Sequence, residues 1–285
     1  MAGLEGAVGA VTAVTGFEKG SGKTTFLNHA LPFLRQSGPV AVFTIGVDGA
    51  LKARDLRGSS PEIRVEPGDV VMTTDAFARQ GTASLEVLEA LPGRSALGRL
   101  FLGRALRGGS VTLVGSEHFS VLAEAIAQVR RESWAPSVLV DGAVNRLTQV
   151  SALGEVGFVY TVRIDRGNLG RATQRIRNLS LLAALPHEPV PQEESLCLEG
   201  PLTHSLLETL PQGTTRLSLE DFTKVFLEPA ELARALSAFR VSVRRAFPLR
   251  CIVVVLRDVD RMEFLSALGE PSVDSILFNP YEVAC

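Results

Sequence analysis

A ten-residue segment, GFEKGSGKTT at residues 16–25, constrains the fold of this chain more than any other part of it. It follows the run VGAVTAVT (residues 8–15), whose β-branched and small apolar residues are typical of a buried parallel strand. From Lys23 to Arg35 apolar residues recur at helical spacing, and we expect Pro32 to kink or shorten the last turn. A buried strand, a glycine-rich loop and a helix, in this order, form the context of a phosphate-binding loop.

The candidate nucleotide-binding residues of this loop are Gly20, Ser21, Gly22, Lys23, Thr24 and Thr25. In a phosphate-binding loop, backbone N–H groups surround the β-phosphate, and a lysine neutralises the β- and γ-phosphate oxygens. Lys23 would supply this charge, Thr24 the hydroxyl that ligates magnesium, and Thr25 a second hydroxyl near the α-phosphate. The motif G-x-x-x-x-G-K-[ST] places its first glycine at Phe17, whereas this chain has Gly16 one position earlier. The alternative is a glycine-rich turn that caps a helix and binds no ligand.

Two aspartates that follow predicted strands are candidates to hold magnesium. Asp141 comes at the end of SVLVDG, and Asp48 follows PVAVFTIG within the run VDG. A phosphate-binding loop needs a further acid to hold magnesium, usually where a buried strand ends. We therefore predict Thr24, Asp48 and Asp141 as metal ligands, and Lys23, Asp48 and Asp141 as catalytic residues. Each aspartate also precedes a glycine, so each can instead begin a turn.

The alternation of predicted strands and helices indicates an α/β protein. The predicted strands are residues 8–16, 39–46, 69–74, 111–115, 137–142 and 158–164, and the predicted helices are residues 23–35, 120–131 and 168–185. This order predicts a mostly parallel sheet of the P-loop NTPase type, with helices on both faces. The segment PHEPVPQEES (residues 186–195) is predicted to be a linker. We thus divide the chain into a nucleotide-binding domain (1–185), this linker, and a smaller α/β C-terminal unit (196–285).

Composition and charge argue against several other classes of protein. The formal net charge is −2, so no basic field favours nucleic acid as a partner. The three cysteines lie far apart without metal-ligand spacing, which favours a reducing compartment over a disulfide-bonded secreted fold. The N-terminus lacks the basic region of a signal peptide, and no apolar run approaches the about 20 residues that span a bilayer. We expect a cytoplasmic protein, and we interpret the arginines between residues 163 and 177 as a solvated face or a docking surface for an acidic partner.

Six segments of the chain together resemble one protein family. They are TGFEKGSGKTT, FTIGVDG, VVMTTDAFA, VLVDGAVNR, LEDFTKVF and ILFNP. In this order they resemble the P-loop reactivase subunit associated with lysine 5,6-aminomutase and ornithine 4,5-aminomutase, roughly from residue 10 to 280. The run from Asp141 to Arg146 departs from the family's usual DGA-x-D-R, because Asn145 stands where the family has an acid.

The resemblance implies a nucleotide-driven chaperone for an enzyme that uses adenosylcobalamin and pyridoxal phosphate. With a MutS-like ATPase partner, such a reactivase would use ATP and Mg²⁺ to expel damaged cobalamin and admit fresh cofactor. The residues themselves imply only the binding of a magnesium nucleotide, ATP or GTP.

Two other functions remain open from the residues. One is an ATP-dependent transferase or ligase of the dethiobiotin-synthetase type, with a substrate pocket beside Lys23 lined by residues 73–79. The other is a nucleotide-gated binding subunit that barely hydrolyses its nucleotide. A homodimer that closes across the nucleotide is compatible with each of these functions.

Overall fold

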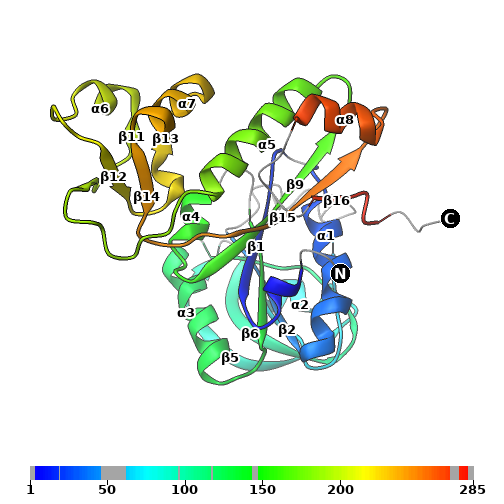
Figure 1. Cartoon of the computed structure of the whole chain (residues 1–285). Coiled ribbons are helices and arrows are strands. Elements are labelled where there is room, and N and C mark those ends of the chain that lie inside the picture. Colours follow the sequence, from blue (N-terminus) through cyan, green and yellow to red (C-terminus); the bar gives the residue numbers. More distant parts are fainter. Residues whose placement is uncertain are drawn as a thin grey trace.

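The computed structural model describes residues 4–18, 20–45, 62–95, 97–116, 118–142, 147–269 and 276–281. Its main feature is a nine-stranded sheet with the order β16-β15-β9-β1-β8-β2-β4-β6-β5 (Figure 1). The strands are β1 (Val11–Gly16), β2 (Val40–Thr44), β4 (Val70–Thr74), β5 (Ser84–Ser95), β6 (Gly98–Arg107), β8 (Ser137–Asp141), β9 (Val156–Ile164), β15 (Leu249–Leu256) and β16 (Ile276–Phe278). Neighbours from β16 to β4 pair in parallel, and β6 pairs antiparallel with both β4 and β5. The predicted α/β class with a mostly parallel sheet is therefore confirmed.

The central strands are buried on both faces, which explains their near-continuous apolar sequences. Every residue of β1 is buried, and β1 lies between β8 and β9. The register pairs Val14 with Asp141 on one side and Gly16 with Thr161 on the other. Alternate residues of β1 face opposite layers, so Ala13 and Val14 belong to different hydrophobic clusters.

Helices cover both faces of the sheet. Helix α1 (Lys23–Leu34) packs Phe26, Leu27 and Leu31 against one face, with the short strands β3 (Ile63–Val65) and β7 (Gly109–Val111) beside it. On the other face lie α3 (Phe119–Arg131), α5 (Leu169–Ala183) and α8 (Arg261–Leu268). The predicted helices at residues 23–35, 120–131 and 168–185 correspond to α1, α3 and α5, and Pro32 lies inside α1.

Residues 186–248, called here the C-terminal module, form small sheets of their own beside α5 (Figure 1). The elements are β10 (Leu196–Cys197), β11 (Leu202–Thr203), α6 (His204–Glu208), β12 (Arg216–Leu219), η3 (Phe222–Lys224), β13 (Val225–Phe226), α7 (Pro229–Ala238) and β14 (Arg240–Val243). Strands β10, β12 and β14 pair in parallel, and β11 pairs with β13. Phe222 and Phe247 of the module stack on each other and on Phe158 of β9, with ring centroids 4.6–5.8 Å apart.

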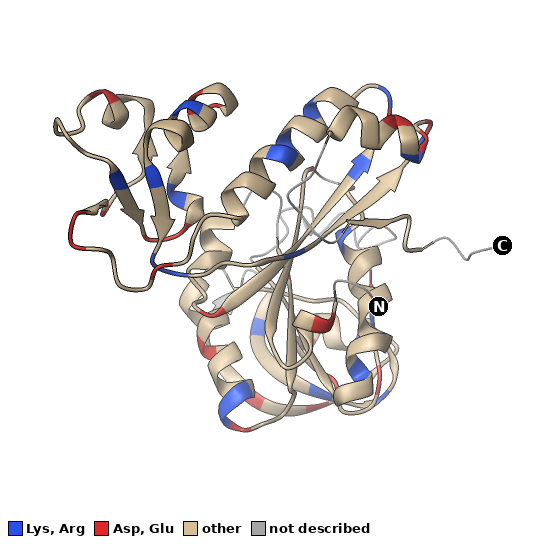
Figure 2. Cartoon of the chain, in the orientation of Figure 1, with Lys and Arg blue, Asp and Glu red and all other residues tan. Residues whose placement is uncertain are grey.

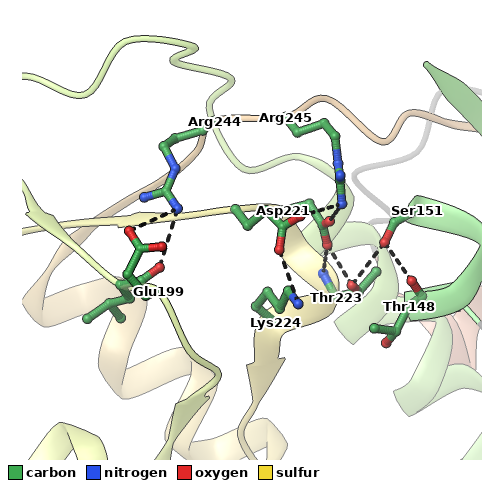
Figure 3. Close-up of polar contacts among 10 residues, drawn as sticks. Thr148, Ser151, Glu199, Asp221, Thr223, Lys224, Arg244 and Arg245 are labelled. Carbon is green, nitrogen blue, oxygen red and sulfur yellow. Dashed lines mark hydrogen bonds and ion pairs between the residues drawn. The ribbon is translucent and has the colours of Figure 1, made fainter. Parts of the chain in front are cut away.

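A buried ion pair also stabilises the module where it meets α4 (Leu147–Ser151), as Figure 3 shows. Asp221 is fully buried and accepts hydrogen bonds from the amide and hydroxyl of Thr223, at 2.8 and 2.6 Å. Its other oxygen pairs with the Arg245 guanidinium. The Ser151 hydroxyl of α4 lies 3.4 Å from the Thr223 hydroxyl, so this network continues from the module into the main domain.

The strand pairing differs from the expected boundary at residue 196. Although β15 and β16 lie within the expected C-terminal unit of residues 196–285, they extend the nine-stranded sheet beyond β9. The physical reason is that β15 is buried at Cys251–Val254, so the backbone groups along both of its edges need a neighbouring strand to pair with.

None of the helices in the described part of the chain has the length and apolar character that a membrane span requires.

Candidate functional site

The carboxyl ends of β1 and β8 lie side by side at one edge of the sheet. After β1 the chain passes through α1 to β2, which is two strands from β1 in the sheet, beyond β8. After β8 the chain turns in the opposite direction and continues to β9, on the other side of β1. In open α/β sheets, ligands bind at such a reversal of strand order, outside the carboxyl ends of the strands. The loop after β1 and the end of β8 meet at this position.

The loop after β1 folds back tightly over the end of its own strand. A β-carbon added at Gly16 would collide with the Ser21 hydroxyl and would lie 2.8 Å from the Thr161 hydroxyl. Gly20 and Gly22 have φ angles of +83° and +91°, in the left-handed region that favours glycine. The loop therefore requires glycine for space at Gly16 and for backbone conformation at Gly20 and Gly22.

Ser21 anchors the loop through its side chain. It is buried, and its hydroxyl lies 2.9 Å from that of Thr161 on β9. Because the Thr161 hydroxyl donates to the Thr15 carbonyl at 3.1 Å, it accepts from Ser21. The Phe17 amide also donates to the Thr161 carbonyl at 3.0 Å. Both the hydroxyl and the amide of Ser21 are thus engaged by the protein, since the amide donates to the Glu18 carbonyl at 3.3 Å.

Helix α1 begins at Lys23 with an uncapped N-terminus. Gly22 is its N-cap residue, no side chain caps it, and its first turn contains no acid. Within the described residues, the amides of Thr24 and Thr25 donate to no acceptor. Lys23 and Thr24 are half-buried and Thr25 is exposed. Free amides and the positive end of a helix dipole favour the binding of an anion, and Lys23 is the first residue of this helix.

Asp141 is the last residue of β8 and lies at the same edge of the sheet. It is half-buried, and its carbonyl accepts hydrogen bonds from the Ile45 amide at 2.9 Å and the Thr44 hydroxyl at 3.3 Å. Its register partner Val14 is two residues before Gly16, where the loop begins. Strand pairing therefore places a carboxylate beside the loop, as a magnesium-nucleotide site would require.

The set of metal ligands predicted from the sequence is only partly described. Thr24 and Asp141 supply a hydroxyl and a carboxylate, which are the oxygen donors that Mg²⁺ prefers. Asp48, Asn145 and Arg146 lie outside the described residues. Across the parts of the chain that are described, no cluster of three His, Cys, Asp or Glu residues could hold a metal. The donor set fits a magnesium ion that keeps several water molecules and also contacts phosphate.

Phe17 belongs to the hydrophobic core. Its side chain is only 8% exposed, and the guanidinium groups of Arg171 and Arg175 lie 5.2 and 5.6 Å from its ring centroid. Arg171 also pairs with Glu18 at 3.8 Å, and Arg175 donates to the Tyr160 hydroxyl at 3.1 Å. Burial raises the pKa of Tyr160, against the opposing influence of Arg175. Two arginines of the predicted basic stripe thus contact the ring of Phe17 and stabilise the position of the loop.

Tyr281 also contacts the loop, a role that no sequence pattern predicts. Its hydroxyl donates to the Gly22 carbonyl at 3.4 Å, and its ring meets the edge of His29, with centroids 5.6 Å apart. Burial raises the pKa of Tyr281 and lowers the pKa of His29. Tyr281 and Gly22 are 259 residues apart in the sequence, so no local sequence pattern predicts their contact. The pairing of β16 with β15 brings Tyr281 to the loop.

Comparisons with known proteins add nothing to this geometry, because no family model matches the chain and neither curated proteins nor solved structures give a significant match.

Proposed function

We propose that this chain binds a magnesium nucleotide, ATP or GTP, at residues 20–25, in a sheet of the P-loop NTPase type. The observation that carries the proposal is the uncapped N-terminus of α1, which opens at the topological reversal of the sheet after a loop folded back at Gly16. Glycine-rich loops followed by a helix N-terminus are the standard receptor for phosphate groups.

The roles of the site residues follow from their positions. The amides of the loop and of the first turn of α1 bind the phosphates, and Lys23 neutralises their charge. Thr24 and Asp141 hold the magnesium ion, directly or through water, and Asp48 is proposed as a third group near the γ-phosphate. Ser21 could bind phosphate only through its amide, which in this structure donates to the Glu18 carbonyl at 3.3 Å, because its hydroxyl is bonded to Thr161.

We further propose that nucleotide hydrolysis drives the reactivation of an aminomutase that uses adenosylcobalamin and pyridoxal phosphate. The support for this step is the resemblance of six segments to the aminomutase reactivase subunit. In this function the chain works in the cytoplasm beside a MutS-like ATPase subunit. Purified chain, partner ATPase and inactivated aminomutase, given Mg-ATP and fresh adenosylcobalamin, should recover mutase activity. Equal recovery without ATP would contradict the proposal.

A small-molecule transferase or ligase is the second candidate, favoured by one observation. Helix α2 (Asp75–Ala78) starts directly after β4, so residues 73–79 lie at the same edge of the sheet as Asp141 and on its side of β1. An acceptor bound there would lie on the γ-phosphate side of the loop. Release of ADP that depends on a small carboxylate or alcohol, without any partner protein, would favour this function over the chaperone.

The nucleotide site itself is tested by changing Lys23. Lys23→Ala removes a charge-assisted contact to phosphate, so the affinity for Mg-ATP should fall by about 1.5–3 kcal/mol, or roughly 10- to 150-fold. Lys224→Ala is the matched control, because Lys224 pairs with Glu220 in the C-terminal module and lies in no predicted site. Calorimetric titrations of the two variants should differ accordingly. An unchanged affinity in a folded Lys23→Ala protein would refute the site.

A further inference from the structure

A groove lies on the C-terminal module, away from the nucleotide loop. Two adjoining hollows, of about 380 and 390 Å³, share Arg216, Leu236, Phe239 and Arg240. The groove is bounded by β12 and β14, by the end of α7, and by residues 185–195, which connect α5 to the module. Its apolar lining is contributed by Leu236 of α7 and by Phe239, which follows this helix, so the groove offers an apolar wall as well as charge.

The two arginines of this groove lie side by side on neighbouring strands. Arg216 and Arg240 are register partners on β12 and β14, so their side chains leave the sheet on the same face. Figure 2 shows blue bands, which mark Lys and Arg, on neighbouring strands of the module. Within the described chain, neither guanidinium lies within 4 Å of an acid, whereas Arg244 pairs with Glu199 and Arg245 with Glu220. Like charges on neighbouring positions of adjacent strands repel each other and destabilise the fold. An anion bound between the two guanidinium groups would reduce this repulsion.

The rest of the lining indicates which kind of anion fits. Ser195, Ser242 and Gln192 contribute polar groups, and Leu236 and Phe239 contribute apolar surface. Two acids, Glu188 and Glu194, line the groove as well, and the Glu188 carboxylate accepts a hydrogen bond from Gln192 at 3.3 Å. Paired guanidinium groups are suited to the two oxygens of a carboxylate, and the apolar wall is suited to a hydrocarbon substituent beside it.

We propose that this groove binds a carboxylate attached to an apolar group, with the carboxylate held between Arg216 and Arg240. The site is independent of the nucleotide loop, and its ligand is either a small carboxylic acid or the C-terminus of a partner polypeptide. Both sources present the same chemistry to the two arginines.

Binding is tested with N-acetyl-leucine and its neutral analogue N-acetyl-leucinamide, titrated into the full chain and followed by the side-chain N–H signals of arginine in NMR spectra. N-acetyl-leucine should shift the signals of Arg216 and Arg240, and the amide should not. Arg216→Gln and Arg240→Gln should each weaken binding about tenfold. Arg234→Gln is the matched control, because Arg234 is exposed on α7 and does not line the groove. Equal response to acid and amide, or equal affinity in all three variants, would overturn the proposal.

A hexapeptide that ends in leucine distinguishes the two sources of ligand. Binding tighter than that of N-acetyl-leucine, lost when the peptide's carboxylate is amidated, supports a polypeptide C-terminus. Binding no tighter than that of N-acetyl-leucine supports a small acid.

The repulsion between the arginines gives a test that needs no ligand. In low-salt buffer without carboxylates, Arg240→Gln should raise the melting temperature by about 1–3 °C, because it removes one of two opposed charges. The increase should vanish in 1 M NaCl, where charges are screened within about 3 Å. Arg234→Gln should leave the melting temperature unchanged. A melting temperature of Arg240→Gln at or below that of the wild type at low salt would contradict the premise of the proposal.

Discussion

At the scale of single residues, the loop combines residues that shape it with residues that we propose to bind a ligand. Gly16 makes room for Ser21, and Ser21 ties the loop to Thr161 of β9. Phe17, which stands where the motif has glycine, points into the core and is covered by two arginines. The sequence marked Lys23 and Thr24 as ligand-binding residues. It could not show that Phe17 and Ser21 are structural, because their partners come from β9 and α5.

Gly16→Ala tests this tight folding of the loop. The new methyl group would collide with the Ser21 side chain and approach the Thr161 hydroxyl to 2.8 Å, so the loop must shift. We expect a loss of about 1–3 kcal/mol in the free energy of unfolding and a clear loss of nucleotide affinity. Gly200→Ala is the matched control, because no atom lies within 4 Å of a β-carbon there. Chemical denaturation and calorimetry of both variants measure the difference; equal behaviour would mean that the loop is open at Gly16.

Asp141→Asn separates the binding of magnesium from the binding of phosphate. The amide keeps the shape of the side chain but removes the charge that would hold the ion. We expect magnesium-dependent turnover to fall by tenfold or more, while retention of the nucleotide falls much less. Hydrolysis assays and nucleotide titrations at several Mg²⁺ concentrations give the two values. Parallel loss of both would assign Asp141 to the structure of the β8 turn.

At the scale of elements, the sequence predicted what depends on local pattern. Strand β1, helix α1, strand β8 and helix α5 lie where periodicity placed them. Local pattern carries no information on which sheet a buried strand joins, so β15 was expected in a separate unit. The long hairpin of β5 and β6 was not expected either, because its strands have exposed as well as buried faces and irregular register. Of the predicted strand at residues 111–115, only Val111 lies in a strand, as the last residue of β7.

The element η3 allows a test of how the C-terminal module is held. Burial by itself would raise the pKa of Asp221, but hydrogen bonds from Thr223 and Arg245 outweigh it and hold this pKa below its usual value. The charged form is therefore favoured in the folded state. Its stabilising contribution is present above the unfolded pKa of about 4 and is lost as the pH falls through the lower folded pKa.

Asp221→Asn should accordingly lower the free energy of unfolding by about 1.5–3 kcal/mol at pH 7, because it removes the charge-assisted bond to Arg245, which keeps its second partner Glu220. The difference between wild type and variant should shrink as the pH is lowered from about 5 to 3. Urea unfolding at a series of pH values measures it. A difference that stays constant to pH 3 would show that the carboxylate charge does not hold the module.

At the scale of the whole molecule, helix α5 lies between two distinct surfaces. The nucleotide loop opens at the carboxyl edge, where β1 and β8 diverge, and the arginine groove lies in the C-terminal module. Helix α5 runs between them, since Arg171 near its start covers Phe17 and the residues after its end line the groove. The alternation of elements predicted the sheet class, but only the folded chain shows that both surfaces depend on the same helix.

The most direct test of this account is the response of individual backbone amides to a nucleotide. In ¹H–¹⁵N correlation spectra, saturating Mg-ADP should shift the amide signals of Gly20, Gly22, Lys23, Thr24 and Thr25, whereas adenosine without phosphate should not. These shifts would place the phosphates at the start of α1. Unchanged signals for these five residues under millimolar Mg-ADP and Mg-GTP would contradict the central claim.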